Sequence, residues 1–204
     1  MKSTPYFIPF YLLVITLFIT GCSPSASKDE SVFRMSIKNE PPTLDWTLAT
    51  DSVSFTILTN IMEGLTQYDS ELNAKPAIAK KWEYSEDGQT ITFFLRNDVY
   101  WSDGKQVTAS DFEYSWKRLL APESAAQYAY FLFDIENASQ YNSGKITDPN
   151  KVGIRALAPD VLEVRLKKPV VYFPSITTFM VTFPAREDVI LLHGDSWTEP
   201  ANIV

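Results

Sequence analysis

The fold of this chain is decided by residues 76–112, which read PAIAKKWEYSEDGQTITFFLRNDVYWSDGKQVTASDF. Residues 82–84 and 90–96 predict two short strands, because Asp87-Gly88 between them is a strong hairpin signal. In the second strand, apolar Ile91, Phe93 and Leu95 fall on one side, so this side is expected to be buried. Phe94 interrupts the opposite, polar side and predicts some cover there as well.

A helix is predicted to follow a second turn at residues 101–104, which read Trp-Ser-Asp-Gly. Thr108 with Asp111, or Ser110 with Glu113, has the spacing of a capping box at its start, and Pro122 follows its end. Its apolar stripe is expected to face the strands and consists of Phe112, Trp116, Leu119 and Leu120. Taken alone, these residues predict a small α/β unit.

The same stretch resembles the signature region of the oligopeptide/dipeptide-binding proteins, the family 5 extracytoplasmic solute-binding proteins of ABC importers. The matching residues are Ala79, Trp82, Thr92, Phe93, Leu95, Arg96, Val99, Trp101, Ser102, Asp103, Gly104, Lys105, Val107, Thr108, Ala109, Asp111 and Phe112. Gln106 stands where the family often has proline. The resemblance implies an α/β, periplasmic-binding-protein-like fold whose two lobes close on a ligand, with no catalysis and no cofactor.

The resemblance extends over residues 29–204 and implies a division of the chain. Residues 31–62 would supply the opening strand and helix of lobe I, and residues 63–204 most of a smaller mixed α/β domain. The rest of lobe I and the opposing lobe are absent from this sequence. We therefore expect an N-terminal part of such a protein.

Residues 1–21 differ in composition from the rest of the chain. An apolar run from Phe7 to Thr20 ends in Gly21-Cys22, a pattern that resembles a bacterial lipoprotein signal. The resemblance implies cleavage before Cys22, attachment of lipid to it, and a flexible tether over residues 22–30. The alternative is an uncleaved anchor helix. Because Cys22 is the only cysteine, an internal disulfide is excluded.

The remaining pattern predicts alternating strands and helices. Strands are expected at residues 32–37, 65–68, 152–156 and 161–166. Helices are expected at residues 52–64, 125–139 and 169–179, with a last one running through Leu192. Gly64 is expected at the position just after the first of these helices, where glycine is favoured.

Candidate ligand-binding residues come from the resemblance, which places Thr50, Asp51, Ser52 and Tyr128 toward the ligand. For residues 50–52 the alternative role is the N-cap of the following helix, and both roles are compatible. For Tyr128 the alternative is a core aromatic residue in a segment rich in tyrosine and phenylalanine.

The sequence gives little support for nucleic-acid binding, a zinc site, catalysis or sugar binding. A net charge of −7 disfavours nucleic-acid binding, which needs basic patches. The only histidine, His193, lacks cysteine partners for zinc, and no Gly-x-Ser-x-Gly motif occurs. Asp103 and Asp111 fit turn and capping roles. Trp82, Trp101 and Trp116 fit core packing better than sugar stacking.

The resulting expectation is a lipid-anchored, extracytoplasmic receptor, on the periplasmic side or the cell surface, that captures oligopeptides and delivers them to ABC permease subunits. Its expected partners are the peptide, the permease, and membrane lipid through Cys22. The alternatives are a family member for a nickel complex, haem or an oligosaccharide, and a truncated interaction protein without transport activity.

Overall fold

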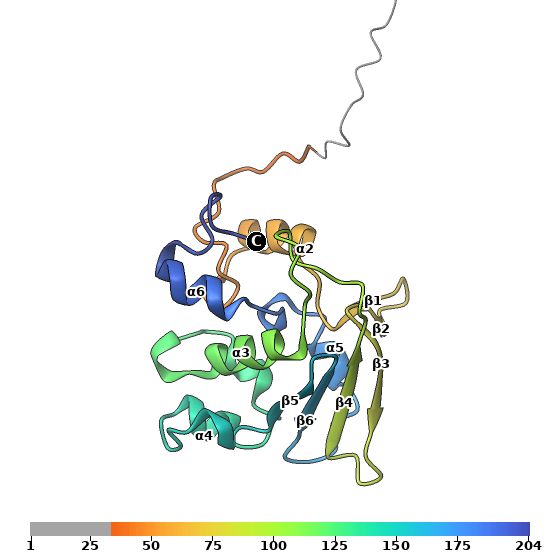
Figure 1. Cartoon of the computed structure of the whole chain (residues 1–204). Helices are drawn as coiled ribbons and strands as arrows, with labels where there is room; N and C mark the ends of the chain where they lie inside the picture. Colours follow the sequence, from red (N-terminus) through yellow and green to blue (C-terminus); the bar gives the residue numbers. More distant parts are fainter. Residues whose placement is uncertain (1–33) are drawn as a thin grey trace, which may run out of the picture. The chain divides into compact units, whose positions relative to one another are not determined.

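The computed structural model describes residues 34–204, and residues 37–204 form one compact unit. Its centre is an antiparallel sheet in the order β3-β4-β6-β5. These strands are β3 (Ala79–Tyr84), β4 (Thr90–Leu95), β5 (Ile154–Ala158) and β6 (Val161–Arg165). A separate two-stranded ribbon pairs β1 (Thr66–Tyr68) with β2 (Ala74–Pro76). In Figure 1 the helices α3 and α4 lie to one side of the larger sheet.

The hairpin predicted in residues 82–96 is confirmed. β3 and β4 pair with Trp82 opposite Phe93, and the turn closes with a hydrogen bond from the Gly88 amide to the Ser85 carbonyl. Gly88 has φ +67°, a left-handed conformation that glycine adopts without a steric penalty. Ile91, Phe93 and Leu95 are fully buried, as their alternation predicts. The cover predicted for Phe94 is the ammonium group of Lys81, 4.5 Å from its ring centre.

The helix predicted after Gly104 is α3 (Ala109–Leu120), which packs chiefly on β5 and β6. A capping box between Thr108 and Asp111 begins it, which decides between the two boxes that the sequence allowed. Its predicted stripe, Phe112, Trp116, Leu119 and Leu120, is fully buried. Trp116 also donates a hydrogen bond of 2.7 Å from its indole nitrogen to the Thr182 carbonyl.

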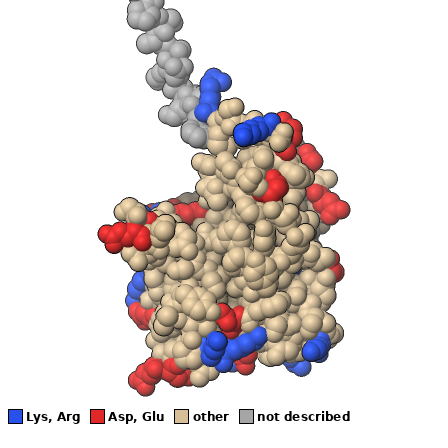
Figure 2. Space-filling model, turned by 180° about the vertical axis from the view of Figure 1, so that it is seen from behind, with Lys and Arg blue, Asp and Glu red and all other residues tan. Residues whose placement is uncertain are grey.

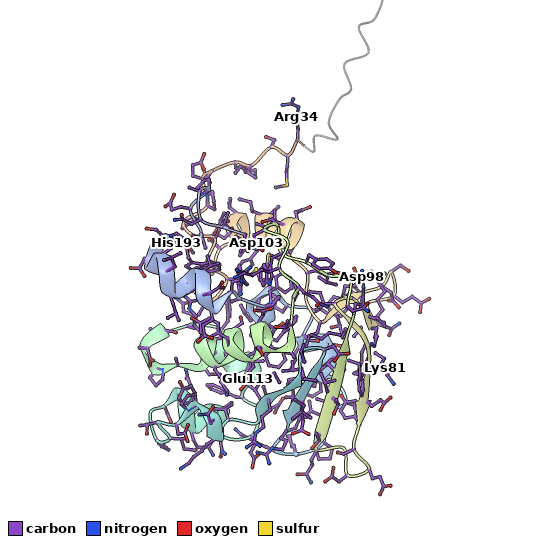
Figure 3. All side chains as sticks on the ribbon, in the orientation of Figure 1. Arg34, Lys81, Asp98, Asp103, Glu113 and His193 are labelled. Atoms are coloured by element: carbon purple, nitrogen blue, oxygen red, sulfur yellow. The ribbon has the colours of Figure 1, made fainter. Side chains whose placement is uncertain are left out.

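A side chain of α3 also covers an edge of the sheet. Glu113 accepts a hydrogen bond of 2.7 Å from the backbone amide of Ala156 in the edge strand β5. The other Glu113 oxygen binds Lys117 at 2.5 Å, so the carboxylate is held in place. Figure 3 labels Glu113 on α3 beside this strand, and Lys81 on the opposite edge.

The remaining helices are short. They are α2 (Ser52–Ile61), α4 (Ala138–Asn142), α5 (Phe173–Ile176) and α6 (Glu187–His193), with 3-10 turns at Pro122–Ser124, Ala129–Leu132, Pro149–Lys151, Met180–Thr182 and Gly194–Ser196. The strands expected at residues 65–68, 152–156 and 161–166 are confirmed as β1, β5 and β6 to within two residues. The ribbon strand β2 was not predicted, since its sequence Ala-Lys-Pro carries no strand signal. No helix within residues 34–204 is both long and apolar enough to cross a membrane.

Two predicted elements were wrong in the described region. Of the strand expected at residues 32–37, residues 32 and 33 lie outside the described region. Residues 34–37 form no strand, because their backbone pairs with no other strand in residues 34–204. The helix expected at residues 125–139 is a 3-10 turn at Ala129–Leu132 followed by α4. Ala125 and Asn137 have φ +47° and +60°, and these left-handed residues prevent a continuous helix.

Two helix ends also differ from prediction. The helix expected at residues 169–179 is only α5, Phe173–Ile176. Residues 52–64 end earlier, as α2, so Gly64 lies beyond the helix rather than at its C′ position. Gly64 is instead required by close packing, because a Cβ atom there would lie 2.6 Å from the Thr177 carbonyl oxygen.

Candidate functional site

The first candidate residues lie at the start of α2. Asp51 is its N-cap: one carboxylate oxygen accepts hydrogen bonds of 3.0 Å from the Val53 and Ser54 amides, and the other accepts one of 2.7 Å from the Ser54 hydroxyl. The Ser54 hydroxyl is the main reason that the pKa of Asp51 lies below its usual value. The capping role proposed for this segment is confirmed, while Thr50 and Ser52 remain exposed.

Tyr128 is half-buried in a cluster of aromatic rings, which we call the aromatic wall. The wall consists of Phe55, Tyr128, Tyr130, Phe131 and Phe179. The Tyr128 ring centre lies 5.7 Å from that of Phe179 and 6.0 Å from that of Phe55, mostly in tilted or edge-on geometry. The Tyr128 hydroxyl makes no hydrogen bond within residues 34–204, so it is available to another molecule.

Phe55 joins the two groups of candidates. Its backbone amide bonds to the carbonyl of Asp51, one helical turn earlier, and its ring contacts that of Tyr128. Residues 50–52 and Tyr128, although about 76 positions apart, therefore lie on neighbouring parts of one surface. The structure brings the two groups together through a residue that the sequence analysis did not select.

The surface of the wall is uncharged, since all five of its residues are Phe or Tyr. Figure 2 shows the molecule from behind, and most of that face is free of Lys, Arg, Asp and Glu, which gather toward its edges. Among residues 34–204 no group of three His, Cys, Asp or Glu side chains has the arrangement of a metal site. The wall can offer aromatic faces and the hydroxyls of Tyr128 and Tyr130, but no fixed charge.

A cavity of about 450 Å³ lies outside the aromatic wall. It is lined by Ile61 and Met62 at the end of α2, by the loop 99–102, and by Val204. No candidate residue from the sequence lines it. Because it shares no residue with the aromatic wall, it is a separate feature of the surface.

A largely buried ion pair that no local sequence pattern predicted holds the segment before α2. Arg118 in α3 donates to both carboxylate oxygens of Asp45, at 2.9 and 2.5 Å, and to the Thr47 hydroxyl at 2.6 Å. The indole of Trp197 donates to the same carboxylate at 3.3 Å. Burial lowers the pKa of Arg118, but the hydrogen bond and charge of Asp45 outweigh it and raise that pKa.

This cluster fixes the segment leading to α2. The Asp45 carbonyl accepts hydrogen bonds from the Leu48 and Ala49 amides, which closes the turn immediately before Thr50. The only sequence signal for it is an arginine beside the buried Leu119. No local pattern links that arginine to an aspartate so far away in the chain.

A second charged cluster joins the turn after Trp101 to α6. The guanidinium of Arg186 bonds to Asp103 at 2.9 Å and to Asp188 at 2.7 and 2.9 Å. Lys105 reaches the same Asp188 carboxylate at 2.5 Å. Figure 3 labels Asp103 and, at the far end of α6, the half-buried His193. Asp103 and Asp111 therefore serve the turn and the cap, as the sequence indicated.

Comparison with known proteins identifies the family. Residues 73–204 match the model of the bacterial extracellular solute-binding proteins, family 5 Middle. The oligopeptide-binding protein OppA of Bacillus subtilis is 36% identical over 188 residues, which cover 87% of this chain and 34% of the relative. The probable deoxycholate-binding periplasmic protein YgiS of Escherichia coli is also 36% identical, over 86% of this chain and 33% of the relative.

Solved structures of similar proteins support the same family and fold. The substrate-binding domain of an oligopeptide ABC transporter from Bacillus anthracis superposes with a TM-score of 0.77 at 39% identity, covering 80% of this chain and 31% of that one. The chain thus spans about a third of the length of the relatives it matches. The expected α/β, periplasmic-binding-protein-like fold class is confirmed. This chain belongs to the family 5 bacterial extracellular solute-binding proteins, which are binding proteins rather than enzymes.

Proposed function

We propose that this chain forms one wall of the ligand cleft in a peptide receptor of a bacterial ABC importer. The observation that carries the proposal is the aromatic wall, where Tyr128 offers an unbonded hydroxyl on an uncharged surface beside residues 50–52. Every peptide presents the same backbone N–H and C=O groups, so a wall without fixed charge suits ligands of many sequences. The relative named as oligopeptide-binding supports this assignment.

In this proposal the protein binds and delivers, without chemistry. The peptide is held between this wall and an opposing lobe that closes on it by a hinge motion. The closed complex then delivers the peptide to the permease subunits. Thr50 and Ser52 contribute at the start of α2, and Tyr128 contributes its hydroxyl.

Calorimetry tests the two-walled binding. The chain alone should show no saturable binding of mixed tri- to pentapeptides up to millimolar concentration, because one wall supplies only part of the contacts while the entropic cost of association stays nearly whole. The same chain joined to the remaining length of OppA from Bacillus subtilis should bind, and Tyr128→Phe should weaken that binding. Micromolar binding by the chain alone, or unchanged binding after Tyr128→Phe, would contradict the proposal.

We also propose that Cys22 anchors the protein on the outer side of a bacterial membrane. Cys22 and its flanking residues lie outside the described region, so the proposal rests on the sequence Ile19-Thr20-Gly21-Cys22 after an apolar run. Cys22→Ser should abolish labelling by a fatty-acid analogue and leave the precursor uncleaved. Equal labelling of both forms would refute it.

A second ligand class is favoured by one observation. A relative of similar identity is named for deoxycholate, and the apolar face of that bile acid's steroid skeleton also suits an aromatic wall, provided that its carboxylate lies outside the wall. Deoxycholate below its micelle concentration should therefore be titrated into the joined protein beside the peptides. If it binds and peptides do not, the wall serves a sterol-like ligand.

A further inference from the structure

A groove of about 270 Å³ opens beside the aromatic wall, and we call it the tyrosine groove. Its apolar lining consists of Tyr68, Phe131, Tyr172, Ile176 and Phe179. Two of these rings, Phe131 and Phe179, also pack against Tyr128, at 5.9 and 5.7 Å between ring centres. The groove is therefore continuous with the surface that we assign to the ligand.

The groove is built on a rigid base. Beneath it, the buried hydroxyl of Thr66 in β1 donates to the Pro174 carbonyl at 2.5 Å and lies 2.8 Å from the Thr177 hydroxyl. Both threonines are essentially inaccessible to solvent. Gly64 packs directly against the Thr177 carbonyl, so no side chain separates the two segments. α5 and β1 are thereby fixed against each other, and the groove is formed before any ligand arrives.

The rims of the groove are two tyrosines that lie about half exposed, Tyr68 at 47% and Tyr172 at 53%. The Tyr172 hydroxyl donates to a carboxylate oxygen of Asp134 at 2.7 Å, and this bond raises the pKa of Tyr172. The Tyr68 hydroxyl reaches the Ser175 carbonyl at 3.4 Å. Both hydroxyls are thus directed to protein acceptors, and the rings present their apolar faces.

No charged side chain lines the groove; its remaining lining residues are Ser175 and Thr178. The Thr178 hydroxyl is already engaged with the Ser175 carbonyl at 2.8 Å. An uncharged recess penalises a charged ligand group, which would lose water there without gaining an oppositely charged partner. The same recess gains free energy by covering apolar surface.

We propose that the tyrosine groove is a specificity pocket for one large apolar side chain, aromatic or aliphatic, of a peptide held against Tyr128. The inference rests on the proposed function and deepens it. It assigns Ile176 and Tyr172 as residues that select this side chain. Elsewhere along the wall, binding to the peptide backbone leaves the other side chains unselected.

The groove is tested by NMR with capped amino acids, whose backbone is constant and whose side chain varies. Amide spectra of the purified, isotope-labelled chain are recorded with the N-acetyl amides of Phe, Leu, Lys and Asp. The Phe and Leu probes should shift the amides of Ser175, Ile176 and Thr178 at about 10 mM, without saturating, as expected for an isolated contact with a Kd above about 10 mM, worth less than about 2.7 kcal/mol. The Lys and Asp probes should shift them at least about fivefold less.

Variants distinguish binding in the groove from nonspecific binding of the probes to apolar surface. Ile176→Asp should reduce the Phe shifts by about fivefold and increase those of Lys, since it places a carboxylate in the recess. Leu191→Asp is the matched control, because this leucine is 73% exposed on α6, away from the groove, and should leave all shifts unchanged. If Ile176→Asp does not fold, Tyr172→Ala removes one rim at an exposed position and should also weaken the Phe shifts.

The outcomes separate the two proposals. Equal shifts with all four probes, no shifts at these amides, or no effect of the groove variants would overturn the pocket, even if the joined protein binds peptides in calorimetry. If the joined protein binds no peptide, the proposed function fails, and with it the role of the groove in peptide selection. Selective shifts together with peptide binding support both.

Discussion

The guanidinium group of Arg118 binds both carboxylate oxygens of Asp45, although the two residues are 73 positions apart. The Asp45 side chain is 7% exposed, and that of Arg118 is 21% exposed. Such a pair is held in low dielectric, where each charge depends on the other. Through the turn that follows Asp45, it also sets the position of the candidate residues at the start of α2.

Removing one partner of this pair should be strongly destabilising. Arg118→Met is expected to lower the free energy of unfolding by about 3–5 kcal/mol, because it leaves the Asp45 carboxylate buried without a counter-charge. Arg118→Lys keeps the charge but loses the bidentate geometry, so its loss should be smaller. Urea unfolding measures both. A loss below about 1 kcal/mol for Arg118→Met would show that water or Trp197 satisfies Asp45.

Trp116→Ala tests the packing of α3 on the sheet. Trp116 is fully buried and donates its indole hydrogen to the Thr182 carbonyl, so truncation should cost about 3–5 kcal/mol. Tyr100→Ala is the control, since Tyr100 is 59% exposed, and it should change stability by less than about 0.5 kcal/mol. Similar losses for the two variants in chemical denaturation would be inconsistent with the buried stripe.

Gly64→Ala tests the close approach beneath the tyrosine groove. A methyl group there would lie 2.6 Å from the Thr177 carbonyl oxygen, so the segments must move apart, at a cost of about 1–3 kcal/mol. Gln67→Ala, at an exposed position in β1, should be nearly neutral. Thermal unfolding compares the two variants, and an unchanged melting temperature for Gly64→Ala would mean that this contact is not tight.

The cluster around Arg186 predicts a pH dependence. The hydrogen bonds from Arg186 are the main reason that the pKa of Asp188 in the folded protein lies below the usual value of 3.8, and the hydrogen bond from Lys105 is the next. A carboxyl group whose pKa is lowered by folding stabilises the folded protein at pH values above its pKa in the unfolded chain. This stabilisation is lost as the pH falls through its pKa in the folded protein. The melting temperature of the wild type should therefore exceed that of Asp188→Asn at neutral pH. The difference should shrink below about pH 4, and a difference that stays constant down to that acidity would contradict the assignment.

The parts of the fold that the sequence predicted are those encoded by neighbouring residues. The hairpin at Asp87-Gly88, the capping box of α3 and the buried alternation of β4 each depend on positions a few residues apart. The aromatic segment at residues 125–139 was predicted incorrectly because its rings pack on Phe55 and Phe179 rather than along one helix. Neither ring is near it in sequence, so tertiary contacts overrode the local pattern.

In the candidate site, too, local sequence predicted some features, whereas others depend on contacts between residues far apart in the chain. Asp51 was predicted as an N-cap from local sequence, and the structure confirms that role. The position of Tyr128 beside α2 depends on Phe55, and the support of that region depends on the pairing of Asp45 with Arg118. Side-chain pairs so far apart leave no periodic signal, because they arise only when separate elements pack together. The ligand roles of Thr50, Asp51, Ser52 and Tyr128 stay predictions.

The bond from the Ala156 amide to Glu113 has a consequence for molecules of this protein that meet one another. An unpaired strand edge offers a row of amides and carbonyls on which a strand from another molecule can assemble. Here a carboxylate from the chain's own helix, itself fixed by Lys117, already occupies one of those amides. We expect the Glu113 carboxylate to repel the carbonyl oxygens of an approaching strand. At high concentration, molecules of this protein should therefore resist edge-to-edge association of their sheets into larger aggregates.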